Sequence, residues 1–308
     1  MLYARSYPPQ KHVLIVAACA MFYVTSVGAG ILNKLAVSKT AVHPTVLSLS
    51  HLVFAGVLDV VYMLAAALAG RARGDRGVKP SAIEVLAAFG PVSLCMVLGK
   101  LCTYASYTTL NMSLTQTAKA LEPLFNVSLA YIVFGEEKPI LTAVTLVPIA
   151  VGVALASFGE STFNVIGFLF ALASAAFKVL QNITLKRVFV SEEFTFVETH
   201  LLGALSGLAI LLPFMLYEAM MATTALFPRH SFVVLVASAV AQYMASISSY
   251  LLLSLVQHLS FTVINCVKRL AIICAGVVYF GVRVSVWNGA GIGLAMLGVL
   301  WYNLAKVA

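Results

Sequence analysis

Charged residues are scarce in this chain of 308 residues, since Asp, Glu, Lys and Arg together make up 10% of it. A soluble domain carries about 25% charged residues, so the composition excludes an ordinary water-soluble enzyme and a disordered chain. The net charge of +8 does not indicate nucleic-acid binding, because the basic residues are scattered between long apolar runs. The composition indicates a membrane protein that does not bind nucleic acid.

Motifs for catalysis and metal binding are also missing. The sequence has no Gly-x-Ser-x-Gly turn, no Walker A loop and no Cys/His pair at metal-ligand spacing. Its five cysteines fall inside apolar runs, where we expect them to pack as small apolar side chains and not to form disulfides. We therefore expect no catalytic residue, no metal and no cofactor, and a protein that is not an enzyme.

Apolar residues make up 61% of the chain, and the mean hydropathy is +1.00. About 20 such residues cross a bilayer as a helix. The sequence predicts an all-α polytopic membrane protein with ten transmembrane helices, near residues 12–34, 44–70, 84–109, 113–135, 140–158, 163–185, 196–221, 231–256, 260–282 and 284–305.

The basic residues of the loops predict the orientation. With segment 1–11 in the cytosol, ten loop Lys and Arg residues face the cytosol and three, Lys39, Arg229 and Arg283, face the other side. The positive-inside rule favours this arrangement, with both termini cytosolic. Residues 1–10 resemble neither a signal peptide nor an organelle presequence. We therefore favour the Golgi or endoplasmic reticulum, leave an organelle envelope open, and expect a monomer.

The predicted spans divide into two sets of five, over residues 12–158 and 163–305. The fourth and ninth spans each carry basic residues at a similar depth, and the fifth and tenth are both rich in small residues. Because five is an odd number, a duplicated half must cross the membrane in the opposite direction. This pattern indicates two inverted five-helix repeats, the plan of many secondary transporters.

Ionisable residues inside the predicted spans indicate a binding site. Five cations stand against two acids, which leaves a surplus of three positive charges. Each cation costs about 2.5–3.5 kcal/mol at the bilayer centre, so the surplus suits a water-filled cavity that receives an anion. The cations are Lys100, Lys119, Lys178, Lys268 and Arg269, and the acids are Asp59 and Glu122.

The cations also have alternative explanations. Lys119 precedes Glu122 by three residues, the spacing of a structural ion pair on a helix, although we expect it to contact substrate. Lys268 and Arg269 are expected to have no acid nearby and to line the cavity. Lys100 could instead extend its amine to the membrane interface.

Lys178 also has an alternative explanation, and Asp59, His51 and His200 are expected to play structural parts. Lys178 could lie at the cytosolic end of its helix, and Asp59 is expected to cap a helix or pair within its own half. His51 and His200 look like interfacial residues without an identifiable partner.

Lysine and arginine together suit a phosphate group. Arginine offers a planar fork for two phosphate oxygens, and lysine offers a point charge. Hydroxyls such as those of Thr103, Thr115 or Tyr104 could bind the remainder of a small polyol.

Five sequence segments resemble the triose-phosphate translocator family of the drug/metabolite transporter superfamily. The resemblance implies ten helices in two inverted repeats and the exchange of organic phosphates, often against inorganic phosphate. It also implies that Lys119, Lys268 and Arg269 hold the phosphate, and that Lys100 and Thr103 contact the rest of the substrate. The segments are Asn33-Lys34, Thr117–Phe125, Leu180–Ile183, Asn265–Arg269 and Gly298–Asn303.

Three positions depart from the plastid members of that family. Those members have histidine at the position of Lys100 and arginine at that of Gln181. They also have a tyrosine in the eighth helix, at a position that lies two residues after Tyr243 in this chain. Lys178 lies one turn from Gln181, so we predict that Lys178 or Lys100 replaces the arginine charge. The predicted substrate-binding set therefore includes Lys178, Gln181 and Tyr243.

The function we predict is exchange of a small organic phosphate, such as triose phosphate, phosphoglycerate or phosphoenolpyruvate, against phosphate by alternating access. A nucleotide-sugar transporter of the same superfamily and a non-transporting membrane scaffold remain as alternatives.

Overall fold

The computed structural model describes residues 9–69, 82–135, 143–160, 163–189, 196–221, 229–256 and 258–305, and within them it contains helices and links but no strands. Part of the N-terminal segment and the basic stretch 71–81 lie outside these ranges. The helices are α1 (Pro9–Ser38), α2 (Pro44–Leu68), α3 (Ala82–Thr109), α4 (Met112–Ala118), η1 (Lys119–Leu121), α5 (Glu122–Phe134), α7 (Leu146–Phe158), α8 (Val165–Phe189), α9 (Phe196–Met221), η2 (Arg229–Ser231), α10 (Phe232–Leu255), α11 (His258–Phe280) and α12 (Val286–Ala305).

Six helices in the described part of the chain are long and apolar enough to cross a membrane, and they are α1, α2, α8, α9, α10 and α11. This confirms an all-α protein with several membrane-spanning helices, but it supports the predicted ten spans only in part. α5 and α7 have 13 residues each, which is short for a complete crossing. α3 and α12 have 28 and 20 residues, and they carry polar side chains within apolar sequences, namely Lys100 in α3 and Asn288 and Asn303 near the two ends of α12.

The fourth predicted span is not one regular α-helix, because a turn of 3₁₀ helix separates α4 from α5. Pro123 has no N–H with which to reach the carbonyl of Lys119. The N–H of Glu122 binds that carbonyl instead and closes one turn of 3₁₀ helix, Lys119–Leu121, between α4 and α5. The α-helical hydrogen bonding is therefore interrupted at Pro123, close to the lysine.

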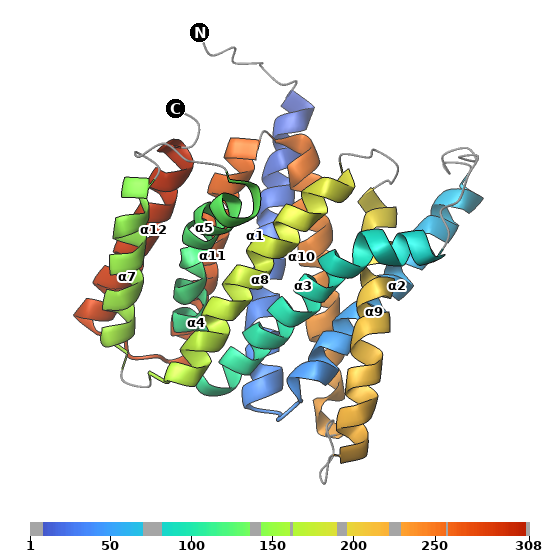
Figure 1. Cartoon of the computed structure of the whole chain (residues 1–308), viewed down its shortest axis with the longest axis horizontal. Coiled ribbons are helices and arrows are strands. Elements are labelled where there is room, and N and C mark those ends of the chain that lie inside the picture. The colour runs from blue at the N-terminus through green and yellow to red at the C-terminus, as the bar shows by residue number, and fades with distance from the viewer. Residues whose placement is uncertain are drawn as a thin grey trace.

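The helices form one bundle with two distinct edges (Figure 1). α7 and α12 pack together at one edge, α2 and α9 at the other, and the remaining helices lie between them. Glycines bring α7 and α12 close together, because a Cβ at Gly152 would lie 2.4 Å from the Ala295 nitrogen and one at Gly291 would lie 2.3 Å from the Ala156 nitrogen. Such small-residue contacts are typical of membrane helix pairs.

The pairing of α3 with α8 places several of the predicted site residues. A Cβ at Gly99 would lie 3.4 Å from the Phe177 Cβ and 3.8 Å from the backbone nitrogen of Lys178. The close approach sets Lys178 of α8 beside the part of α3 that carries Lys100 and Thr103. The absence of a side chain at Gly99 thus allows the close packing that brings Lys178 near Lys100.

The link between α3 and α4 is held from two sides. The buried amine of Lys34, on α1, donates hydrogen bonds to the carbonyls of Tyr107 and Leu110 at the end of α3. A cation at this position satisfies carbonyls that the helix leaves unpaired. On the other side, Asn111 donates a 3.1 Å hydrogen bond to Glu160. Lys34 therefore stabilises the fold at the end of a helix.

Candidate functional site

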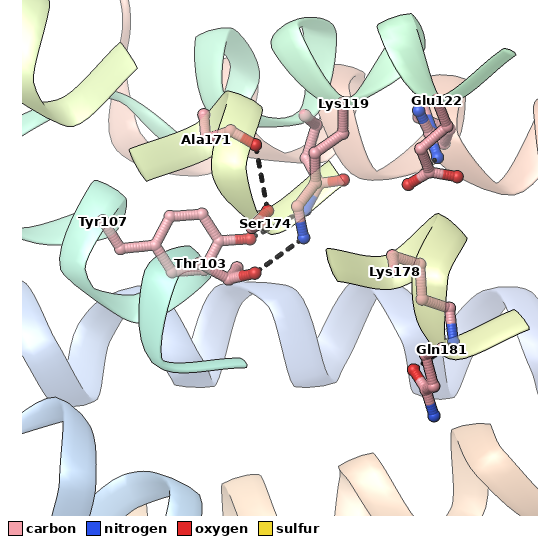
Figure 2. A network of polar contacts seen from close by, with 10 residues as sticks. Thr103, Tyr107, Lys119, Glu122, Ala171, Ser174, Lys178 and Gln181 are labelled. Atoms are coloured by element: carbon pink, nitrogen blue, oxygen red, sulfur yellow. Dashed lines mark hydrogen bonds and ion pairs between the residues drawn. The ribbon is translucent and has the colours of Figure 1, made fainter. Parts of the chain in front are cut away.

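Lys119 is the first residue of η1, between α4 and α5, and its side chain points toward α3. Its Nζ donates a 2.7 Å hydrogen bond to the Thr103 hydroxyl, which itself donates to the Gly99 carbonyl at 2.8 Å. Figure 2 shows the amine directed at Thr103, with Tyr107 close by. Two of the predicted substrate-binding residues are thus in direct contact.

Arg269 on α11 forms an ion pair with Glu122, the first residue of α5. Its Nη2 lies 2.9 Å from Glu122 Oε1, and both side chains are partly exposed, at 19% and 27%. The expectation that the Lys268–Arg269 pair has no acid nearby is therefore wrong. The two helices bring together residues that are far apart in the sequence. Glu122 pairs directly with Arg269, and it interacts with Lys119 only through the electric field.

Lys268, next to Arg269 on α11, lies over the ring of Phe22 from α1. The ammonium is 4.8 Å from the ring centroid, and Phe22 is 2% exposed. A cation at that distance is attracted to the face of an aromatic ring. Phe22 therefore fixes the position of Lys268 without neutralising its charge.

Lys178 and Gln181 lie together on α8, as their spacing predicted, with 3.1 Å between Nζ and Oε1. Figure 2 shows both side chains on the same part of α8, near Glu122. Lys178 is exposed although it interacts with charges from η1, α5, α11 and α3. One of these charges is Lys100 on α3, which also interacts with His51.

The cations form one group, which we call the cation cluster: Lys119, Lys178, Lys268 and Arg269, around Glu122. Lys268 interacts electrostatically with the four other residues, and Lys119 does the same. Four cations around one carboxylate leave a surplus of three positive charges. The cluster joins η1, α5, α8 and α11, so its geometry depends on how both halves of the chain pack. An arrangement of this kind attracts an anion.

Tyr243 has a different partner. Its hydroxyl donates a 3.0 Å hydrogen bond to Asp59 Oδ1, and His200 Nδ1 lies 2.6 Å from Asp59 Oδ2. Asp59 is fully buried. The expectation that Asp59 pairs within its own half is wrong, because its partners lie on α9 and α10. His200 likewise has a partner that the sequence did not identify. Whether Tyr243 contacts substrate stays a prediction.

Two of the hydroxyls considered for a polyol are bonded inside the protein. Tyr104 contacts His51 Nδ1 at 2.8 Å, and Thr115 contacts the Ser106 hydroxyl at 2.9 Å. His51 also reaches Ser238 on α10 at 3.3 Å. These contacts make Thr103 the candidate hydroxyl that lies against a cation of the cluster.

Sequence reasoning missed Phe22 and the pairing of Glu122 with Arg269. No local pattern marks Phe22, which resembles any apolar residue of a membrane helix. Glu122 was identified as an acid inside a span, but its partner depends on tertiary packing. In the part of the chain that the structure describes, no group of His, Cys, Asp and Glu could hold a metal ion.

Comparisons with known proteins agree with this arrangement. Residues 13–303 match the Triose-phosphate Transporter family. The chain is 34% identical over 233 residues to the phosphoenolpyruvate/phosphate translocator 3, chloroplastic, of Oryza sativa subsp. japonica, covering 73% of this chain and 59% of that protein. It is 31% identical over 301 residues to the non-green plastid triose phosphate/phosphate translocator of Brassica oleracea var. botrytis, covering 93% and 71%.

One crystal structure shares the fold, with a TM-score of 0.56 at 15% identity, over 94% of this chain and 96% of the other. At that identity the likeness concerns the fold alone. The family match covers most of the chain and includes every residue of the cation cluster. The chain therefore belongs to the Triose-phosphate Transporter family, a family of membrane transporters and not of enzymes.

Proposed function

We propose that the protein is a secondary transporter that exchanges a small organic phosphate against inorganic phosphate by alternating access. The observation that carries this proposal is the cation cluster, in which four cations surround the single carboxylate of Glu122. The names of the plastid relatives, which are phosphate translocators, support the same class of substrate. The matched region spans 59% of the rice relative, so its substrate is not carried over.

Within the proposed site, Arg269, Lys268 and Lys119 bind the phosphate group. Arg269 offers two parallel N–H donors, and the two lysines offer point charges. Thr103, Lys100, Lys178 and Gln181 face the remainder of the substrate. This division follows the contacts, since Thr103 lies against Lys119 and Gln181 lies against Lys178.

Glu122 explains how the empty site stays stable. It neutralises Arg269 while no anion is present, and an arriving phosphate competes with it for the guanidinium. A bound dianion then cancels most of the surplus charge and lets the site close away from water. An empty site that retains three uncompensated cations resists the same closure, because charges are costly in a medium of low dielectric. Exchange is therefore favoured over net transport.

We further propose ten transmembrane helices in two inverted repeats, 12–158 and 163–305. The packing supports this, because exchanging the repeats maps the contacting helix pairs onto one another. α1 packs on α10 as α8 packs on α3, and α2 packs on α10 as α9 packs on α3. The α2–α9 and α7–α12 pairs each map onto themselves. The 3₁₀ turn at Lys119 interrupts the regular α-helix at the proposed site.

For the cellular arrangement we propose a monomer with both termini cytosolic. The basic loops support this orientation. An internal membrane, either the Golgi or the endoplasmic reticulum, is our proposed location, with an organelle envelope as the other outcome of a localisation experiment.

The test is radiolabelled phosphate uptake into proteoliposomes that contain the purified protein. Each set is preloaded with phosphate, triose phosphate, 3-phosphoglycerate, phosphoenolpyruvate, a hexose phosphate, a UDP-sugar or buffer alone. We expect uptake only with an internal phosphate or organic phosphate, and none in the Lys268→Ala/Arg269→Ala variant.

Other outcomes separate the alternatives. Equal uptake into vesicles with buffer alone contradicts exchange. Transport of the UDP-sugar without transport of phosphate makes the protein a nucleotide-sugar transporter. Binding of phosphate without any flux, in protein that is folded, supports the scaffold.

A further inference from the structure

Asp59, His200 and Tyr243 form a polar group deep in the bundle, away from the contacts of the cation cluster. Both carboxylate oxygens of Asp59 have a partner, Oδ2 at 2.6 Å from His200 Nδ1 and Oδ1 at 3.0 Å from the Tyr243 hydroxyl. Asp59 has no exposed surface, whereas the His200 side chain is 16% exposed. The function proposed above makes no use of this group.

The group joins helices from the two sets of five spans. Asp59 lies on α2, in the region 12–158, and its partners lie on α9 and α10, in the region 163–305. α2 and α9 are also joined at the opposite end of the pair, where Glu218 accepts a 2.7 Å hydrogen bond from Thr45. The two contacts lie about 21 Å apart along α2 at 1.5 Å per residue. A movement that separates the two halves at the Asp59 end must break the Asp59–His200 contact.

His200 is placed to compensate the negative charge of Asp59. Among the described residues, His200 is the cation-forming side chain at ion-pair distance from it. A buried carboxylate inside a membrane protein is costly without a countercharge, and the imidazole supplies one when it takes up a proton. In the part of the chain that the structure describes, the other titratable groups on α2 and on the helices packed against it include Tyr62 and His51 on α2 itself, Glu198 and Glu218 on α9, Tyr243 on α10, and Lys100 on α3, which acts on His51.

We propose that the Asp59–His200 pair is a proton-binding site that couples protons to the conformational change of the transporter. With a proton on the imidazole the pair is neutral and holds α2 against α9 and α10. Without that proton the buried carboxylate is uncompensated, and the state in which α2 separates and Asp59 meets water is favoured. Acid therefore favours closure of this end of the bundle, and alkali favours its opening. The role in transport rests on the function proposed above, whereas the proton site itself does not.

The key variant is Asp59→Asn. An asparagine oxygen can accept the Tyr243 hydrogen bond and its amide can donate to His200, so the fold is retained while the negative charge is lost. His51→Gln is the matched control, because His51 is another buried histidine of α2 that contacts hydroxyls and no carboxylate. The rates of phosphate/phosphate exchange are measured in proteoliposomes between about pH 5 and 8.

We expect the wild-type rate, divided by the Asp59→Asn rate at the same pH, to change about five- to tenfold between acid and alkali. The division removes the titration of phosphate itself, which affects both proteins. His51→Gln should keep the wild-type profile. A constant ratio in well-folded Asp59→Asn protein overturns the proposal.

A second measurement does not need transport. Spin labels at Val57→Cys and Leu205→Cys, two exposed positions across the α2–α9 groove, report the separation of these helices in protein without its native cysteines. We expect longer distances at alkaline pH with Asp59 and unchanged distances with Asn. If no phosphate moves but these distances shift with pH, the proposed function fails and the proton site stands. If the distances are the same at both pH values, the proton site is wrong whatever the vesicles transport.

Discussion

The cation cluster and the Asp59 group both place ionisable side chains inside the bundle, but they satisfy them differently. In the cluster, four cations share the carboxylate of Glu122, and Lys178 is exposed. In the Asp59 group, every carboxylate oxygen has a donor and the carboxyl is fully buried. The first arrangement is incomplete without an anion, whereas the second is complete within the protein. The difference separates a site for solute from a contact that holds helices together.

The largest effect should come from removing charge in the cluster. Lys268→Ala/Arg269→Ala deletes two charged contacts to phosphate, each worth about 1.5–3 kcal/mol, so exchange should fall at least about 100-fold. Thermal stability should not fall, because the change relieves repulsion among the cations while leaving one partly exposed carboxylate. Melting curves in detergent and vesicle uptake measure the two effects. A large loss of thermal stability would mean that Lys268 and Arg269 stabilise the fold, as Asp59 does.

The opposite pattern should follow from Asp59→Ala. Removing one partner of a buried ion pair costs about 3–5 kcal/mol, so this variant should melt at a much lower temperature than the double alanine variant. Asp59→Asn, which keeps the hydrogen bonds, should recover most of the loss. If the Asp59→Ala protein is as stable as the wild type, the Asp59 group does not hold the helices together, and the difference between the two regions is wrong.

A smaller change tests the part that Glu122 plays. Glu122→Gln frees Arg269 and raises the surplus charge of the cluster. Phosphate should bind about two- to fivefold more tightly, the scale of one weak charged contact, and the maximal exchange rate should fall because the more positive empty site closes less readily. Saturation kinetics in vesicles separate the two parameters. Weaker binding would mean that Glu122 positions Arg269 for phosphate and does not compete with it.

The smallest effect should come from the aromatic ring beneath Lys268. Phe22→Leu keeps an apolar side chain but removes the face of the ring, so the KM for phosphate should rise about threefold with little change in the maximal rate. Phe89→Leu, which changes another fully buried phenylalanine, is the control. Identical KM values for the two variants would deny Phe22 a specific role.

The sequence predicted the features that depend on local composition. The places of the helices follow from long apolar runs. The 3₁₀ turn at Lys119 also has a local cause, the missing N–H of Pro123, although the span was expected to be one helix. The gathering of Lys119, Lys268 and Arg269 was predictable because cations inside spans are too costly to face lipid.

The pairings were not predictable. Glu122 lies three residues from Lys119, yet it bonds to Arg269 because α5 and α11 converge. Asp59 carries no local sign of His200 or Tyr243, which come from two later helices. Such contacts depend on which helices pack together, and the packing of the bundle is not encoded in any short segment.

The central claim, that the cation cluster is the anion site, is tested most directly by equilibrium binding of radiolabelled phosphate to the purified protein. Lys39→Ala/Arg283→Ala is the matched control, because it also removes one lysine and one arginine, both exposed and in links between helices. We predict that the control binds phosphate as the wild type does and that Lys268→Ala/Arg269→Ala binds at least about 100-fold more weakly. Equal affinity of the two double variants would contradict the account.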